Sequence, residues 1–263
     1  MAKIAVTGAS GQIGPRLCDD LARDYEVVRI DLKGADVNLD IRDFAAVEKA
    51  LSGVETVIHL AADSAVSASW ENSFHVNIGG TYNIFEGARR QGCKRVIFAS
   101  SNHAVGMYEI DNKPQIYEGT TGILVRNDSE LRPDGFYGVS KIFGEALGRF
   151  YSDEYGLQVS CVRIGSCLGV DDPKHPSLAQ GAAWLNLTVE QKYKRYASTW
   201  LSQRDLAGCM RAIMSRDVPF AIIYAVSDNL TRFWDLEPGR AIYGWWPVDG
   251  VGEGGKVVRA PVS

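Results

Sequence analysis

The feature that most constrains the fold is a glycine-rich turn between a strand and a helix. An apolar run at 3–7 leads into Gly8, Gly11 and Gly14, and a helical pattern follows over 12–24. Glycine permits a tight turn and a close approach of the backbone, and the start of a helix offers free N–H groups to a phosphate. Because the turn opens a βαβ unit, it predicts a pyrophosphate-binding site.

The rest of the chain repeats the alternation of strand and helix. Ser202 is a suitable N-cap for a later helix, with Asp205 in its first turn. Since parallel crossovers are almost always right-handed, the order favours an α/β fold: a doubly wound parallel sheet of the Rossmann type with a small C-terminal substrate-binding portion. Strands are predicted at 3–7, 26–31, 55–60, 94–99, 158–164 and 220–225, and helices at 12–24, 43–52, 72–91 and 137–155.

The length predicts one domain. The chain has 263 residues, and domains commonly run to about 250 residues, so 1–263 is interpreted as a single Rossmann-type domain. Two long segments, 102–136 and 165–200, interrupt the alternation. Both would leave the carboxyl ends of strands, where open α/β sheets bind ligands, so we expect them on the substrate side. The glycine-rich tail from Asp249 is expected to be loosely held.

Charge, cysteine content and hydropathy exclude several classes of protein. The net charge of −4 argues against binding to nucleic acid. No run approaches the ~20 apolar residues that are needed to cross a bilayer. The first residues have the pattern of a strand, so no signal peptide is expected. We therefore expect a soluble, cytoplasmic protein with a small-molecule partner. Reduced core thiols and no metal site are expected, because no metal-ligand spacing is found around Cys18, Cys93, Cys161, Cys167 and Cys209.

The end of the second strand indicates the dinucleotide. Asp31 lies about 20 residues beyond the glycine turn, where a carboxylate can accept hydrogen bonds from the adenosine ribose. Its charge would repel a 2′-phosphate, so NAD is favoured over NADP, although Arg29 and Lys33 could reverse the preference and Asp31 could simply cap its turn. Asp40 and Ile41 are candidates for adenine contact.

Tyr137 and Lys141 are the candidates for acid–base chemistry. They stand four residues apart on a predicted helix, so their side chains lie on one face. An adjacent ammonium and a cationic nicotinamide would both favour the phenolate of Tyr137. Ser101, at the end of the fourth predicted strand, could orient the oxygen of a substrate. Without the other motifs, a Tyr/Lys pair at this spacing could equally be an ordinary pair on a helix surface.

With these motifs, the chain resembles the extended branch of the short-chain dehydrogenase/reductase superfamily, which includes sugar epimerases and dehydratases. The matching segments are TGASGQIG at 7–14, the Ser101 segment and YGVSK at 137–141. The resemblance implies a triad of Ser101, Tyr137 and Lys141, in which Lys141 lowers the pKa of Tyr137 and holds the nicotinamide ribose. The cofactor site that it implies comprises Gly8, Ser10, Gly11, Gln12, Ile13, Gly14, Asp31, Asp40, Ile41, Leu60, Ala61, Ala62, Asn77, Tyr137, Lys141 and Ile164.

Within that branch the chain looks most like the uronate dehydrogenases. FASSNH at 98–103, VRIGSC at 162–167 and STWLS at 198–202 carry this narrower likeness. It implies transfer of hydride from C1 of a cyclic hexuronate, glucuronate or galacturonate, to NAD, which gives an aldarolactone. Arg195 would bind the substrate carboxylate, as suits a planar guanidinium. The other substrate contacts implied are Ser64, Ser101, Asn102, His103, Tyr137 and Ser166.

Several alternatives remain at this point. The chain is also similar to archaeal-type enzymes that oxidise glucose 6-phosphate, and Ser101 and Tyr137 stand 36 residues apart, a spacing longer than the uronate pattern. Another aldose is therefore possible. A nucleotide-sugar epimerase or dehydratase would retain its cofactor, and an NAD-sensing regulator would need neither Tyr137 nor Lys141. Arg195 could belong to a solvated basic face, and His103 could be an ordinary loop histidine.

Three further expectations concern packing. His59 is predicted to lie in the core, and the tryptophans are expected to be packing groups rather than a sugar platform. The resemblance also implies a homo-oligomer, formed through helices 72–91 and 137–155.

Overall fold

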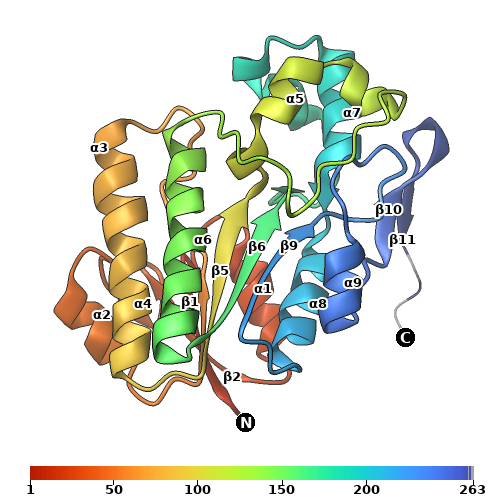
Figure 1. Ribbon diagram of the computed structural model, residues 1–263. Coiled ribbons are helices and arrows are strands. Elements are labelled where there is room, and N and C mark those ends of the chain that lie inside the picture. Colours follow the sequence, from red (N-terminus) through yellow and green to blue (C-terminus); the bar gives the residue numbers. More distant parts are fainter. Residues whose placement is uncertain (260, 262–263) are drawn as a thin grey trace.

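The computed structural model describes residues 1–259 and 261, and its centre is a parallel β-sheet (Figure 1). In this part of the chain the sheet has seven strands in the order β3-β2-β1-β4-β5-β6-β9. This order confirms the predicted Rossmann-type sheet, because the chain reverses direction across the sheet between β1 and β4. The strands are β1 (Lys3–Thr7), β2 (Glu26–Asp31), β3 (Val37–Asn38), β4 (Thr56–His59), β5 (Arg95–Ser101), β6 (Gln158–Ile164) and β9 (Phe220–Ala225).

Helices cover both faces of the sheet (Figure 1). One face carries α1 (Gly14–Leu21), α8 (Gln203–Met214) and α9 (Glu237–Tyr243), and the other carries α2 (Phe44–Ala50), α4 (Gly80–Arg90) and α6 (Phe136–Tyr155). Each layer has its own apolar core, with Leu17, Leu206 and Met210 in the first and Val47, Ile84 and Phe85 in the second. Burial on both faces explains why the strands read as almost continuous apolar runs.

The predicted helix at 72–91 is composite. It begins earlier, as α3 (Trp70–Asn72), and passes through a π-helical stretch, η1 (Ser73–Gly79), before α4. Gly80 begins α4 against Ile41, because a Cβ there would lie 2.5 Å from Ile41 Cδ1. Ser202 caps α8 as predicted, since its hydroxyl accepts a 3.0 Å hydrogen bond from Asp205 N.

The two long segments contain helices of their own. Segment 102–136 forms η2 (Asn102–Val105), α5 (Met107–Asn112) and η3 (Gln115–Glu118), and segment 165–200 forms β7 (Ser166–Cys167), η4 (Pro176–Gln180), η5 (Ala183–Leu185) and α7 (Val189–Thr199). In Figure 1, α5 and α7 lie together above the carboxyl ends of the strands. β7 pairs with β8 (Trp200–Leu201) outside the main sheet.

The prediction of a loosely held tail from Asp249 is wrong for the residues described. β10 (Asp249–Val251) is buried and pairs antiparallel with β11 (Val257–Arg259). The carboxylate of Asp205 accepts hydrogen bonds from the N–H groups of Val248 and Asp249, at 2.7 and 3.2 Å for the shorter contact of each. Arg204 and Arg259 pair with the Asp249 carboxylate. A buried acidic group on α8 thus ties the tail to the fold; residues 260, 262 and 263 of the predicted tail lie outside the described residues.

The remaining packing predictions can be checked one by one. All five cysteines are buried and free, and burial raises the pKa of the Cys167 thiol among others. His59 lies in the core, bonded through Nδ1 to Thr7 Oγ1 at 2.7 Å, and its burial and the nearby Lys141 lower its pKa to about 3. In the described part of the chain, no helix combines the length and apolar character that a membrane span requires.

Candidate active site

A cavity of about 820 Å³ opens at the carboxyl ends of the central strands. Its wall is formed in part by the glycine turn after β1, Asp31 at the end of β2, Ser101 at the end of β5 and Ile164 at the end of β6. This is where open α/β sheets bind ligands. The predicted site residues that line it are Gly8, Gly11, Gln12, Ile13, Asp31, Asp40, Ile41, Leu60, Ala61, Ala62, Ser64, Ser101, Asn102, His103, Tyr137, Lys141, Ile164, Ser166 and Arg195.

Three residues predicted to bind the cofactor, Ser10, Gly14 and Asn77, are not among the residues that line the cavity, but they support its wall. Ser10 donates its backbone N–H to the Asp31 carboxylate at 2.8 Å. Gly14 packs under the turn. Asn77 is buried and brackets Asp63: its Oδ1 accepts from Asp63 N at 2.8 Å and its Nδ2 donates to Asp63 O at 3.0 Å. These contacts help to hold the shape of the site, and direct contact of the three residues with the cofactor stays a prediction.

The glycines of the turn let backbone pack closely against backbone, because a side chain at either of two positions would collide with it. Gly8 has a φ of +72°, and a Cβ there would lie 2.7 Å from Ala61 N. A Cβ on Gly14 would lie 2.4 Å from Gly8 O. The turn and the first residues of α1 therefore pack as closely as a phosphate cradle requires, with the positive end of the helix dipole facing the ligand.

The ribose end of the cavity is acidic. Asp31 lines it and accepts hydrogen bonds from Ser10 N and Leu32 N, at 2.8 and 2.7 Å, which fixes the carboxylate. Arg29, which could have received a 2′-phosphate, donates instead to Asp19 at 2.6 Å. Arg42 also lines the cavity, but its guanidinium is held by Asp40, at 2.9 Å from Nε to Oδ2. The fixed Asp31 carboxylate can accept hydrogen bonds from ribose hydroxyls, which suits NAD.

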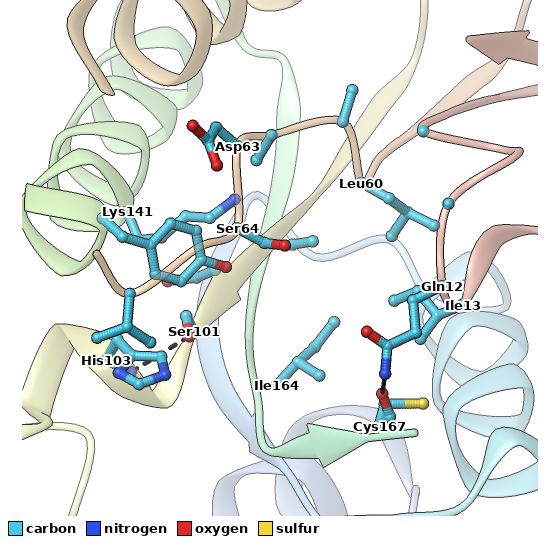
Figure 2. Close-up of a pocket in the computed structure, with 18 of the residues that line it drawn as sticks. Gln12, Ile13, Leu60, Asp63, Ser64, Ser101, His103, Lys141, Ile164 and Cys167 are labelled. Atoms are coloured by element: carbon cyan, nitrogen blue, oxygen red, sulfur yellow. Dashed lines mark hydrogen bonds between the residues drawn. The ribbon is translucent and has the colours of Figure 1, made fainter. Parts of the chain in front are cut away.

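Tyr137 and Lys141 lie in the first two turns of α6 and face the end of β5. The Lys141 Nζ lies 5.4 Å from the centre of the Tyr137 ring and 4.9 Å from that of Phe98. Ser101 Oγ accepts from His103 N at 3.2 Å and lies beside the phenol. Figure 2 shows Lys141, Ser101 and His103 grouped on one side of the cavity, with Gln12 and Ile13 across from them. The structure thus brings the three predicted catalytic side chains together.

Burial dominates the titration of this pair. It raises the pKa of Tyr137 to about 12, partly offset by the hydrogen bond with Ser101, and Asp134 adds to the rise. Burial also lowers the pKa of Lys141 to about 7. Burial therefore decides the direction of both shifts, and the expected lowering of the tyrosine pKa by the ammonium stays a prediction.

The predicted sugar-binding residues line the other end of the cavity. His103 is not an ordinary loop histidine, since its Nδ1 is 2.7 Å from the buried Asp134 carboxylate and its ring lies 5.7 Å from that of Tyr137. Ser166 bonds to Thr199 Oγ1 at 2.8 Å. Trp184 lies 5.6 Å from the His103 ring and lines the cavity, whereas Trp200 and Trp234 are buried packing groups as expected.

Arg195 reaches the cavity wall, yet its guanidinium is already bound. Nε donates to Glu109 Oε1 at 2.5 Å and Nη2 donates to Glu109 Oε2 at 3.3 Å. Tyr117 donates its hydroxyl to the same carboxylate at 2.8 Å. Burial alone would lower the pKa of Arg195, but Glu109 outweighs that effect and the pKa lies above its ordinary value. Arg195 therefore belongs to a buried ion pair, and the solvated basic face is excluded.

Sequence reasoning missed several residues of the site. Trp184 and Asp63 line the cavity, and Asp134 and Glu109 hold His103 and Arg195. No motif marks them, because each acts through a partner or a wall formed only in the folded chain. Within the described residues, no group of three or more His, Cys, Asp or Glu side chains could hold a metal ion.

The fold and the cavity place the chain in a known family. Residues 4–217 match the NAD dependent epimerase/dehydratase family, and the chain belongs to it. This identification agrees with the fit of the glycine turn and Asp31 to NAD, the cofactor of the family.

Within that family the chain is similar to several sugar dehydrogenases. The chain is 36% identical to L-arabinose 1-dehydrogenase (NAD(P)(+)) of Haloferax volcanii over 95% of this chain and 97% of that protein. It is 34% identical to uronate dehydrogenase of Agrobacterium fabrum over 95% of this chain and 85% of that protein. Among solved structures it resembles a mutant uronate dehydrogenase from Agrobacterium tumefaciens complexed with NAD, with a TM-score of 0.78, 31% identity and coverage of 95% and 86%.

Proposed function

We propose that the protein is an NAD-dependent sugar 1-dehydrogenase, which oxidises the C1 hydroxyl of a cyclic sugar to a lactone. The observation that carries the proposal is the grouping of Ser101, Tyr137 and Lys141 in the cavity that also contains the glycine turn and Asp31. Relatives similar along nearly the whole chain, an arabinose 1-dehydrogenase and uronate dehydrogenases, support it.

In this proposal Tyr137 is the general base. Its phenolate oxygen takes the proton of the C1 hydroxyl, and the Ser101 hydroxyl donates a hydrogen bond to the same oxygen. When bound, NAD supplies the acceptor for the hydride that leaves C1. Because the pKa of Tyr137 is about 12 in the ligand-free protein, the phenolate forms effectively only when a positive charge stands beside it. Protonated Lys141 supplies one such charge, and the sugar ring stays closed, so the product is a lactone.

The substrate wall is proposed to come from 102–136 and 165–200, with 1–263 acting as one domain. In this proposal His103, held by Asp134, and Ser166, held by Thr199, bind sugar hydroxyls. The hexuronate substrate favoured by the sequence needs a guanidinium able to receive its carboxylate. Arg195 is engaged by Glu109, so the proposal is limited to C1 oxidation of a cyclic sugar, and the charge of that sugar is a separate question.

We also propose that the protein is a homo-oligomer. Trp70, Phe74 and Phe136 stand together, with ring centres 5.6 Å apart in both contacts of Trp70, and are 46–52% exposed. Such an aromatic patch on the outer face of α3, η1 and α6 suits a second copy of this chain. Light scattering after size exclusion would give a dimer or larger species, and Trp70→Glu would shift it towards monomer; a wild-type monomer would contradict the proposal.

The test is NADH formation from NAD with a panel of aldoses, hexuronates and glucose 6-phosphate. Net NADH with a lactone product is expected, and Tyr137→Phe should lower kcat by at least about 100-fold while NAD still binds. Tyr155→Phe is the matched control, because Tyr155 lies at the far end of the same helix and is 48% exposed. Conversion of a nucleotide sugar without net NADH would replace the proposal with an epimerase.

A further inference from the structure

We infer that Glu109 acts as a built-in counter-anion that occupies Arg195 and makes the site selective for uncharged sugars. This inference rests on the proposed function and names the substrate class of the same site. Glu109 comes from α5, in the long segment between Ser101 and Tyr137, and Arg195 comes from α7. The two helices lie together above the sheet in Figure 1.

Both oxygens of the Glu109 carboxylate accept hydrogen bonds from buried partners. Both oxygens receive a guanidinium donor, and Oε1 also receives the Tyr117 hydroxyl at 2.8 Å. Glu109 is 1% exposed and Arg195 is 5% exposed. In the described part of the chain Arg195 forms part of the cavity wall and Glu109 does not. A ligand therefore meets the neutralised face of an ion pair rather than a bare cation.

Charge then decides which sugars fit. The carboxylate of a hexuronate placed on Arg195 would share one nearly buried guanidinium with Glu109, and like charges at such a buried position disfavour each other strongly. Displacing Glu109 instead would leave a buried anion without its counter-charge, which is costly. A sugar phosphate, with more negative charge, faces the same barrier. A pentose or hexose brings no charge there and keeps the pair intact.

The neighbouring wall suits an uncharged sugar face. The Trp184 ring lies 5.7 Å from the Arg195 guanidinium and 5.6 Å from the His103 ring. The ring lies within cation–π range of the guanidinium and adds an aromatic surface to the cavity wall beside it. Arg195, stacked on Trp184 and fixed by Glu109, is thus a part of the wall held in one orientation.

The test compares kcat/KM for L-arabinose, D-galactose and D-glucose with that for D-glucuronate, D-galacturonate and D-glucose 6-phosphate, all with NAD. The wild type should prefer its best neutral sugar over any anionic one by about 100-fold, which equals about 2.7 kcal/mol. In Glu109→Gln the amide keeps the shape of the carboxylate and removes its charge. The ratio should then shift at least about 10-fold towards the uronates.

Matched variants separate charge from structure. Glu118→Gln removes a carboxylate of the same segment that pairs with Lys194 at 2.9 Å on the surface, so it should leave the preference unchanged. Glu109→Gln combined with Arg195→Gln removes both charges, and the gain with uronates should disappear. Should Glu109→Gln fail to fold, the preference of the wild type for neutral over anionic sugars still tests the inference.

Two results would overturn the inference. The first is a wild-type kcat/KM for a hexuronate or glucose 6-phosphate within about 10-fold of that for the best neutral sugar. It would show that Glu109 does not set the selectivity, while the proposal of C1 oxidation would stand. A Glu109→Gln variant that folds but keeps the wild-type ratio would do the same. If no sugar of either class reduces NAD although the protein binds it, the proposed function itself fails and the inference falls with it.

Discussion

Replacing Lys141 by methionine should flatten the pH dependence of folding stability. Lys141 is 3% exposed, and its burial lowers its pKa to about 7 in the folded protein, whereas a lysine of an unfolded chain has a pKa of about 10.4. Between these values the unfolded chain binds about one proton more than the folded chain at this site. The contribution of Lys141 to the free energy of unfolding therefore rises with pH from about 7 and levels off above about 10.

The size of the effect follows from the same two pKa values. Between pH 7 and pH 9 the free energy of unfolding should rise about 2 kcal/mol more in the wild type than in Lys141→Met. Urea denaturation at pH 7, 8 and 9, without NAD, measures this difference, in which the titration of all other groups cancels. Lys49→Met, at the exposed end of α2, is the control and should follow the wild type. Parallel curves for wild type and Lys141→Met would refute the reasoning.

Three further changes test other parts of the account. In Gly14→Ala the new Cβ would stand 2.4 Å from Gly8 O, so the turn must move and NAD affinity measured by calorimetry should fall about 100-fold; unchanged binding would contradict the cradle. Asp31→Asn should raise the NADP to NAD ratio of kcat/KM at least about tenfold, and an unaltered ratio would exclude charge repulsion. Glu145→Gln leaves the Arg163 guanidinium, 1% exposed, without the negative charge of its 2.8 Å partner and with one acceptor oxygen in place of two, and should cost about 3–5 kcal/mol in urea unfolding; a loss below about 1 kcal/mol would argue that the pair is dispensable.

Features set by near neighbours in the sequence could be predicted. The glycine turn requires only a strand before it and a helix after it, and Tyr137 and Lys141 need only helical spacing to share a face. Ser101 and Asp31 are each the last residue of a strand, and parallel strands bring those ends to one edge of the sheet. Local pattern and topology therefore predict the glycine turn, Asp31, Ser101, Tyr137 and Lys141. Much of the remaining wall, including Ala61, Ser64 and Ser166, is predicted only by the resemblance to the family.

Features set by distant pairs could not be predicted. Glu109 and Arg195 are 86 residues apart, and His103 and Asp134 are 31 apart; neither pair leaves a local pattern. The glycines of the tail predict a loose end, yet the Asp205 carboxylate fixes it from more than 40 residues away. A buried charge gives no sign in the sequence of the partner that neutralises it.

The central claim is that hydride leaves C1 of a cyclic sugar for NAD. The most direct measurement uses an aldose deuterated at C1, with mass spectrometry of the cofactor and the sugar product. The account predicts one deuterium in the reduced nicotinamide and none in a lactone formed in equal amount. Deuterium retained in the sugar product, or an epimerised sugar without net NADH, would contradict it.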